Sequence, residues 1–139
     1  MRINKSYSSV AASLTGYNLT MNSTRTTSLI RLLGESGGAS SSTNVGNGQG
    51  EAGFVPAANA TASTFCNNEI YIPNYLSSNQ KSYSVDSVTE NNASGGYIHG
   101  LLAGLTNMTS AITSITISDT STGNIAANST FYLYGVKNA

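Results

Sequence analysis

Charged side chains are scarce in this chain of 139 residues. Six basic and six acidic residues make up 9% of the sequence, roughly a third of the usual share, and they cancel to a formal net charge of zero. A chain without excess positive charge has no basic surface for a nucleic-acid backbone or an anionic lipid headgroup. We therefore expect neither nucleic acid nor a membrane as a partner.

Cysteine and histidine are almost absent. Cys66 is the only cysteine and His99 the only histidine, so the chain cannot form an intrachain disulfide and lacks the ligands of an ordinary zinc cluster. Asp119 and Asn124, with nearby carbonyl groups, could hold calcium, but the pattern of an EF-hand loop is missing. We expect no metal ion and no cofactor.

Long hydrophobic runs are missing as well. No segment approaches the roughly 18 to 20 apolar residues that cross a bilayer, and residues 1–13 lack the continuous apolar stretch of a secretory signal peptide. Disorder is not favoured either, because the chain has two prolines, no net charge, and eight tyrosines and three phenylalanines from which to build a core. The length fits one folded domain over residues 1–139.

Short runs of β-branched and aromatic residues, separated by Gly, Asn and Ser clusters, dominate the sequence, whereas helical periodicity and strong helix formers are scarce. This pattern predicts an all-β fold, an antiparallel β-sandwich of the jelly-roll-like kind. We expect strands at Tyr7–Ala12, Leu14–Met21, Ser28–Leu33, Glu69–Tyr75, Ser82–Thr89, Tyr97–Leu105, Ala111–Ser118 and Ser129–Val136.

Two of these strands carry further predictions. In Ser82–Thr89 the apolar Tyr83 and Val85 alternate with polar residues, which indicates one buried and one exposed face. Ser129–Val136 is apolar on both faces, and a strand of that kind is normally covered on both sides, within the domain or by another chain. We expect it at the centre of the sheet.

Two segments are predicted to lie outside the regular sheets. Gly34–Gly53 is rich in Gly, Ser and Asn with almost no apolar anchor, which is typical of a long loop, either mobile or held by a neighbouring subunit. Residues 1–12 carry Arg2 and Lys5 as their only charges and are interpreted as an N-terminal arm that docks on a partner. The alternatives for this arm are a frayed terminus or an ordinary edge strand.

One motif points to catalysis. The sequence Gly34-Glu35-Ser36-Gly37-Gly38 matches the Gly-x-Ser-x-Gly nucleophile elbow, and Asp86 and His99 follow in the chain order of hydrolases. In that interpretation Ser36 attacks an acyl carbon, His99 accepts its proton and Asp86 orients the imidazole. The elbow requires a helix directly after the serine, and residues 39–46 are a poor helix sequence. We therefore expect no enzyme activity and no catalytic residues.

Six tyrosines offer a second binding hypothesis, an aromatic platform for a sugar, although such residues more often pack within sheets or form subunit contacts. They are Tyr71, Tyr75, Tyr83, Tyr97, Tyr132 and Tyr134.

Several short segments of the second half follow one another in a characteristic order. They are Ile70–Tyr75, Lys81–Ser84, Glu90–Ala93, Gly104–Ile115 and Asn128–Val136. This series resembles a recurrent β-rich domain of tailed-bacteriophage virion proteins, and Leu-Tyr-Gly-Val at residues 133–136 is similar to the Leu-Tyr-Gly-Ile ending of that domain. Upstream, Ile30–Gly37 is similar to its Arg-Phe-Asn-Gly-Asp-Ser-Gly segment, with Leu33 in place of the usual Asn, which supplies a non-catalytic reason for the apparent elbow.

The resemblance, which covers Leu29–Val136, implies a place in the virion, because the domain occurs in head decoration proteins and in tail or fibre proteins. A domain that stands nearly alone favours a capsid decoration (cement) protein, which stabilises the head by binding between subunits of the major capsid protein. We expect a homo-oligomer, a trimer, made in the host cytoplasm and located on the capsid surface. The alternative is a tail-fibre or receptor-binding module that recognises cell-surface glycan through Gly34–Gly53 and neighbouring loops.

Overall fold

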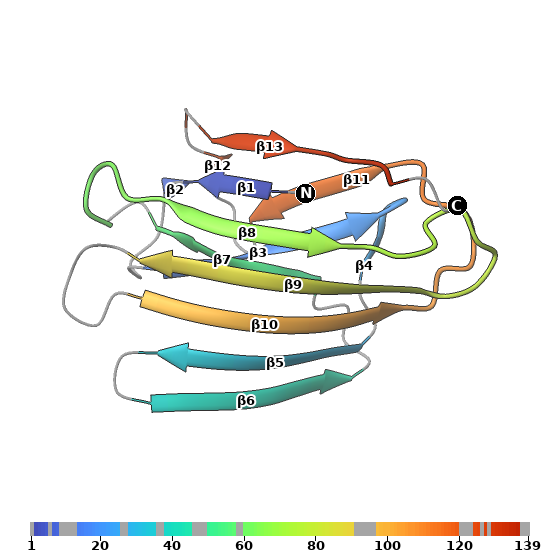
Figure 1. Cartoon of the computed structure of the whole chain (residues 1–139), viewed down its shortest axis with the longest axis horizontal. Coiled ribbons are helices and arrows are strands. Elements are labelled where there is room, and N and C mark those ends of the chain that lie inside the picture. Colours follow the sequence, from blue (N-terminus) through green and yellow to red (C-terminus); the bar gives the residue numbers. More distant parts are fainter. Residues whose placement is uncertain are drawn as a thin grey trace.

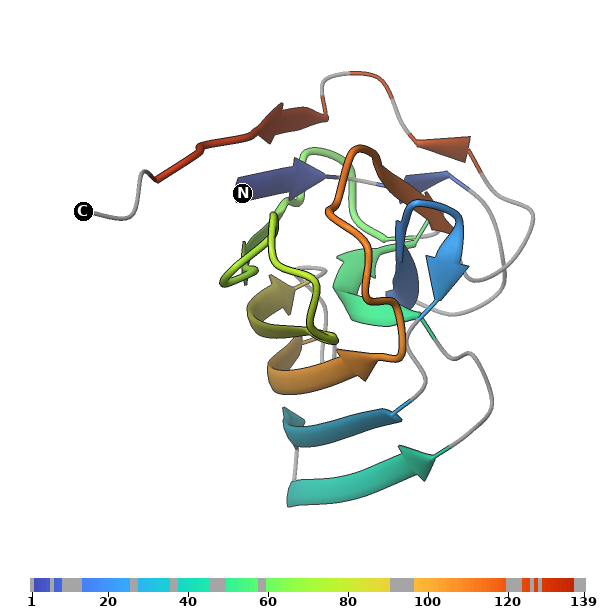
Figure 2. The ribbon, with the colours of Figure 1, turned by 90° about the vertical axis from the view of Figure 1, so that its right-hand side faces the viewer.

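The computed structural model consists of two antiparallel β-sheets packed face to face, without a helix among the described residues (Figure 1, Figure 2). The structure describes residues 2–5, 7–8, 14–25, 28–35, 38–45, 50–57, 60–90, 97–119, 124–125, 127 and 129–136. The prediction of an all-β antiparallel sandwich is confirmed. The fold shares two features with a jelly roll: two packed antiparallel sheets, and connections that cross from one sheet to the other.

Thirteen strands lie within the described ranges. In chain order they are β1 (Arg2–Lys5), β2 (Tyr7–Ser8), β3 (Leu14–Met21), β4 (Thr24–Arg25), β5 (Ser28–Glu35), β6 (Gly38–Val45), β7 (Glu51–Pro56), β8 (Cys66–Tyr71), β9 (Lys81–Glu90), β10 (Tyr97–Thr106), β11 (Ile115–Asp119), β12 (Asn124–Ile125) and β13 (Thr130–Tyr132).

The larger sheet has the strand order β13-β1-β8-β9-β10-β5-β6 and lies nearest the viewer in Figure 1. The second sheet is built on β3, which pairs with β11 on one side and with β7 and β4 on the other, and β12 pairs with β2 in a short ribbon. Figure 2 shows that the second sheet covers only part of the larger one, because β5 and β6 extend beyond it. This hairpin is therefore a protruding flap of the sandwich.

The core lies between the facing sides of the two sheets. Along β8, β9 and β10 buried and exposed side chains alternate, so the predicted alternation of Tyr83 and Val85 with polar residues is confirmed. The core side chains include Tyr17, Leu19, Met21, Leu29, Phe54, Val55, Ile70, Tyr83, Val85, Leu102, Met108 and Ile112. Side chains of the larger sheet also bind the β7 backbone: the Phe54 amide donates to Ser87 Oγ at 3.0 Å, and Asn68 Nδ2 donates to the Phe54 carbonyl at 3.1 Å.

The prediction of a loop over Gly34–Gly53 is wrong. This stretch contains the end of β5, all of β6 and the first residues of β7. β6 forms because every residue from Gly38 to Val45 has a register partner in β5, so a neighbouring strand overrides the weak strand propensity of a Gly- and Ser-rich sequence. Residues 36–37 and 46–49 lie outside the described part of the chain.

The central position predicted for Ser129–Val136 is also wrong. Only Thr130–Tyr132 is a strand, and it occupies one edge of the larger sheet beside β1. The prediction of an N-terminal arm is wrong for Arg2–Lys5, because β1 is paired on both sides, with β13 and with β8. The predicted strand Tyr7–Ala12 begins as β2, and the remainder of that prediction lies outside the described residues.

Candidate functional site

The larger sheet has a second face, opposite to the one that forms the core. Because side chains alternate along a strand, every other residue of β5, β9 and β10 lies on this outer side. Five of these residues are large and aliphatic, and all five are exposed: Ile30 (52%), Leu32 (55%), Val88 (39%), Leu101 (58%) and Leu105 (40%). We call this set the outer apolar face.

Strand register gathers these side chains into one patch. Leu32 is the cross-strand partner of Leu101, and Ile30 is the partner of Ala103. The strand β5 is apolar at both alternations, since Leu29 on the inner side is buried while Ile30 beside it is exposed. Strands of this kind are normally covered on both faces, and contiguous exposed apolar patches mark interaction surfaces.

A shallow hollow of about 670 Å³ lies on the outer side of the sheet, over β9, β10, β5 and β6. Leu32, Val88 and Leu101 line it with apolar groups, and Asp86 and His99 add polar ones. Small ligands are usually held in clefts that surround most of their surface. An open hollow on a sheet is better suited to a side chain of another protein.

The residues of the predicted catalytic triad are only partly described. Ser36 lies outside the described residues, whereas Asp86 and His99 lie exposed on the neighbouring strands β9 and β10. They occupy different register positions, with Asp86 opposite Leu101 and His99 opposite Val88, and the structure contains no hydrogen bond or ion pair between these two described side chains. The His99 ring instead packs edge-on against Tyr97, with a centroid distance of 5.6 Å. The described pair therefore lacks the carboxylate–imidazole bond that orients a general base.

The six tyrosines do not form one platform. Tyr83 is buried in the core, where its hydroxyl donates to the Glu51 carbonyl at 3.1 Å. Tyr71 and Tyr97 are exposed on the outer side but lie at different ends of the sheet, because Tyr71 pairs with Ser84 while Tyr97 pairs with Glu90, a separation of roughly 20 Å along the strand. Tyr132 and Tyr134 are a stacked pair, with centroids 6.4 Å apart, at the far edge.

Metal ligands are dispersed in the described part of the chain, where no three His, Cys, Asp or Glu side chains come together. Asp119 ends β11 and Asn124 begins β12, and residues 120–123 between them lie outside the described part. Cys66, the single cysteine of the sequence, is buried in the core. In the described ranges, no helix has the length and apolar character needed to cross a membrane.

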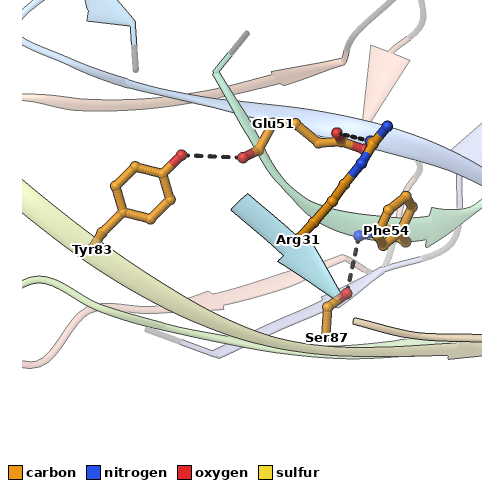
Figure 3. Close-up of polar contacts among 5 residues, drawn as sticks. All are labelled: Arg31, Glu51, Phe54, Tyr83 and Ser87. Carbon is orange, nitrogen blue, oxygen red and sulfur yellow. Dashed lines mark hydrogen bonds and ion pairs between the residues drawn. The ribbon is translucent and has the colours of Figure 1, made fainter. Parts of the chain in front are cut away.

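One charged pair lies between the sheets. Arg31 on β5 forms an ion pair with Glu51 at the start of β7 (Figure 3). Burial raises the pKa of the Glu51 carboxyl, and the attraction and hydrogen bond of Arg31 oppose this rise without cancelling it. The pair ties the protruding β5–β6 flap to the second sheet, which is a structural role.

The C-terminal segment, defined here as Thr130–Val136, is the second exposed apolar feature. Its side chains are 40% exposed at Phe131, 48% at Tyr132, 73% at Leu133, 70% at Tyr134 and 79% at Val136. Figure 2 shows this segment leaving the edge of the larger sheet and extending beyond the rest of the described chain. A smaller hollow of about 300 Å³ beside it is lined by Phe131, Leu133 and the isoleucines of β11 and β12.

Sequence reasoning missed the outer apolar face. The available signal was Leu29–Leu33, in which apolar residues occupy both alternations of a predicted strand, and the same signal was recognised only at the C-terminus. No family model, curated protein or solved structure matches this chain.

Proposed function

We propose that this chain is a structural protein that binds other proteins, acting as a capsid decoration (cement) protein of a tailed bacteriophage. The observation that carries this proposal is the outer apolar face, which leaves Ile30, Leu32 and Leu101 more than half exposed on a regular sheet. The resemblance of Leu29–Val136 to a domain of phage virion proteins supplies the biological setting. The partner is the major capsid protein, and the protein acts as a homo-oligomer, a trimer, on the capsid surface.

The size of the outer side supports this role. Five neighbouring strands, β8, β9, β10, β5 and β6, present a surface of roughly 600 Å² in projection, since strands lie about 4.8 Å apart and rise about 3.4 Å per residue. Stable interfaces bury about 800 Å² per partner. The face is therefore large enough to provide most of one interface.

The chemistry of the surrounding residues also suits a protein partner. Exposed Ser82 and Ser84 on β9 lie opposite Leu105 and Ala103 of β10. Their hydroxyl groups can form hydrogen bonds with a partner without the desolvation cost of a charge. Asp86 and Glu69 are cross-strand partners on the same side, so the complementary surface is expected to carry a basic residue opposite them.

Cement function follows from binding at the junctions between capsid subunits. A protein that binds the assembled shell but not the separate subunits stabilises the shell by mass action. The binding free energies of many weakly bound copies then add up over the capsid lattice. The mechanism needs apolar area and shape complementarity, and it needs no reaction centre.

The test measures copy number and occupancy in phage particles that carry this protein. Quantitative mass spectrometry of purified particles is expected to find it at hundreds of copies, on isolated heads. Leu32→Lys and Leu101→Lys are expected to lower occupancy at least about tenfold, because a charge replaces an interface leucine. The matched control is Leu76→Lys, in the exposed loop after β8, where the leucine is 67% exposed.

Two results would overturn the proposal. The first is a handful of copies confined to tails, which together with binding on a glycan array would favour the receptor-recognition module. The second is full occupancy by both leucine variants.

A further inference from the structure

The two edges of the larger sheet differ from the edges that soluble proteins usually display. One edge is β6, which has β5 as its only strand partner in the described topology. The other is β13, which has β1 on one side and is continued by Leu133–Val136. Exposed strand edges are normally protected by lysine, proline, a bulge or a covering loop, because their free backbone groups can pair with another chain.

β6 carries none of the protective residues. Its sequence, Gly-Ala-Ser-Ser-Ser-Thr-Asn-Val, contains no charge and no proline over eight residues. Residues 38–41 are exposed, and the whole strand lies on the flap that extends beyond the second sheet (Figure 2). β6 is therefore a long, regular and uncharged edge.

The C-terminal segment has the complementary properties. It contains no charge over seven residues, and its large side chains alternate between the two sides of an extended chain, with Phe131 and Leu133 on one and Tyr132 and Tyr134 on the other. All five of its large apolar side chains are exposed in the single chain. Exposed apolar segments of this kind mark sites where another surface binds.

We infer that copies of this chain join edge to edge, with the C-terminal segment of one copy pairing with β6 of the next. The lengths agree, since seven residues of the segment face eight residues of β6. Strand addition supplies backbone hydrogen bonds, and the alternating side chains supply apolar contacts above and below the sheet. The aromatic side chains on one side of the segment, either Phe131 or the two tyrosines, then reach the exposed Ile30 and Leu32 on β5, the strand next to β6.

A single chain cannot make this contact with itself. β13 and β6 are the first and last strands of the seven-stranded order, which places them roughly 29 Å apart at about 4.8 Å per strand. A second copy has no such restriction. Because the two surfaces that meet are different, the contact is head-to-tail and closes into a ring or continues as a filament.

The area is sufficient for a stable contact. Aromatic side chains present about 150–250 Å² each, so the exposed fractions of the segment's five large side chains amount to roughly 500 Å². Buried backbone and the flanking residues of β5 and β6 add to this figure. The sum approaches the roughly 800 Å² per partner of a standard interface.

The inference deepens one part of the proposed function, the homo-oligomer, and rests on that part alone. Three copies joined in this way form the expected ring. The segment then covers Ile30 and Leu32, at the β6 side of each outer apolar face, and leaves Val88, Leu101 and Leu105 uncovered for the capsid. Self-association is measured on the purified chain without capsids, so a failure here is separate from a failure of capsid binding.

The first experiment is sedimentation velocity of the full chain over a range of concentrations. The chain, with a monomer mass of 14.3 kDa, is expected to sediment as a trimer. Two double variants are expected to weaken association at least about tenfold: Leu133→Ser with Tyr134→Ser in the segment, and Ser40→Lys with Ser41→Lys on β6. All four positions are exposed, so far-UV circular dichroism is expected to remain that of the unaltered chain.

Each variant has a matched control. Tyr75→Ser with Leu76→Ser removes an equivalent exposed pair from the loop after β8, and Ser82→Lys with Ser84→Lys adds the same charge in the middle of the sheet. Both controls are expected to stay trimeric. Dissociation of the trimer in the β9 control variant would place the contact between copies on the outer apolar face and overturn the inference.

The decisive experiment mixes the two double variants. The segment variant keeps an intact β6 and the β6 variant keeps an intact segment, so a head-to-tail contact yields one heterodimer that grows no further. Contacts between two copies of β6, or between two segments, would be broken in one variant, unaffected in the other, and produce no heterodimer. Either of those patterns, or an unaltered chain that remains a monomer at every concentration, would overturn the inference.

Discussion

Gly104 and Tyr83 are cross-strand partners, and the Tyr83 ring occupies the space that a side chain at residue 104 would need. They face each other in the register of β10 and β9, and the Tyr83 ring lies directly against the Gly104 backbone. A Cβ atom at Gly104 would be 2.2 Å from the ring carbon that bears the hydroxyl. The ring can therefore lie flat across the sheet and extend its hydroxyl to the Glu51 carbonyl on β7.

Replacing Gly104 by alanine is expected to lower the free energy of unfolding by about 2–3 kcal/mol, because the buried ring must move and give up its packing. Urea unfolding followed by tyrosine fluorescence measures the change. Gly38→Ala in β6 is the matched control, since a Cβ atom there has no neighbour within 4 Å, and its effect is expected to be close to zero. Equal losses in the two variants would contradict the steric explanation.

This relationship also shows what the sequence can reveal. Periodicity correctly assigned Tyr83 and Val85 to a buried face and predicted Leu14–Met21 as a strand with the bounds observed for β3. These features are local, because the pattern of side chains along one strand is enough to identify them. A glycine that accommodates a ring from a neighbouring strand depends on register, which the sequence of one strand does not contain.

The main errors have the same origin. β6 was predicted as part of a loop because Gly and Ser disfavour strands, yet β5 supplies a complete set of backbone partners. The C-terminal strand was placed at the centre because both its faces are apolar, and the structure places it at an edge. Burial by a second chain leaves the same pattern in a sequence as burial within one domain, so the apolar pattern of Leu29–Leu33 and of the C-terminal segment does not reveal which of the two covers them.

Ser87 and Phe54 connect the two sheets. The Phe54 amide on β7 donates to Ser87 Oγ at 3.0 Å, and Ser87 is fully buried (Figure 3). In the Ser87→Ala variant the buried Phe54 amide loses its hydrogen-bond acceptor. We therefore expect the free energy of unfolding to fall by about 1–3 kcal/mol. Thermal and urea unfolding measure the loss.

Ser84→Ala provides the comparison for Ser87→Ala. Ser84 lies on the same strand with its side chain exposed on the other face, so this variant is expected to change stability by less than about 0.5 kcal/mol. A similar loss in both variants would mean that strand propensity, rather than the hydrogen bond to β7, determines the effect.

The buried Glu51 carboxyl makes stability depend on pH. Its folded pKa is raised above the ordinary value of 4.5, with burial as the largest cause and Arg31 opposing it. Between the two pKa values the folded state binds more protons than the unfolded state, so the free energy of unfolding falls as pH rises through this window. The contribution of protonated Glu51 is complete below pH 4.5 and is lost as the pH passes the folded pKa.

Glu51→Gln keeps the shape of the side chain and removes its titration. We expect the difference in unfolding free energy, variant minus unaltered chain, to increase as the pH rises above 4.5 and then to level off, by about 1.4 kcal/mol for each unit that separates the two pKa values. Urea unfolding over a pH series measures this difference, and Glu69→Gln, at an exposed position on β8, controls for the loss of one negative charge. Arg31 is 28% exposed and can turn toward water when its partner is lost, so the neutral variant is not left with a fully buried cation. A difference that falls with rising pH would show that the attraction of Arg31 outweighs burial, and Glu51 would then stabilise the flap in its charged form.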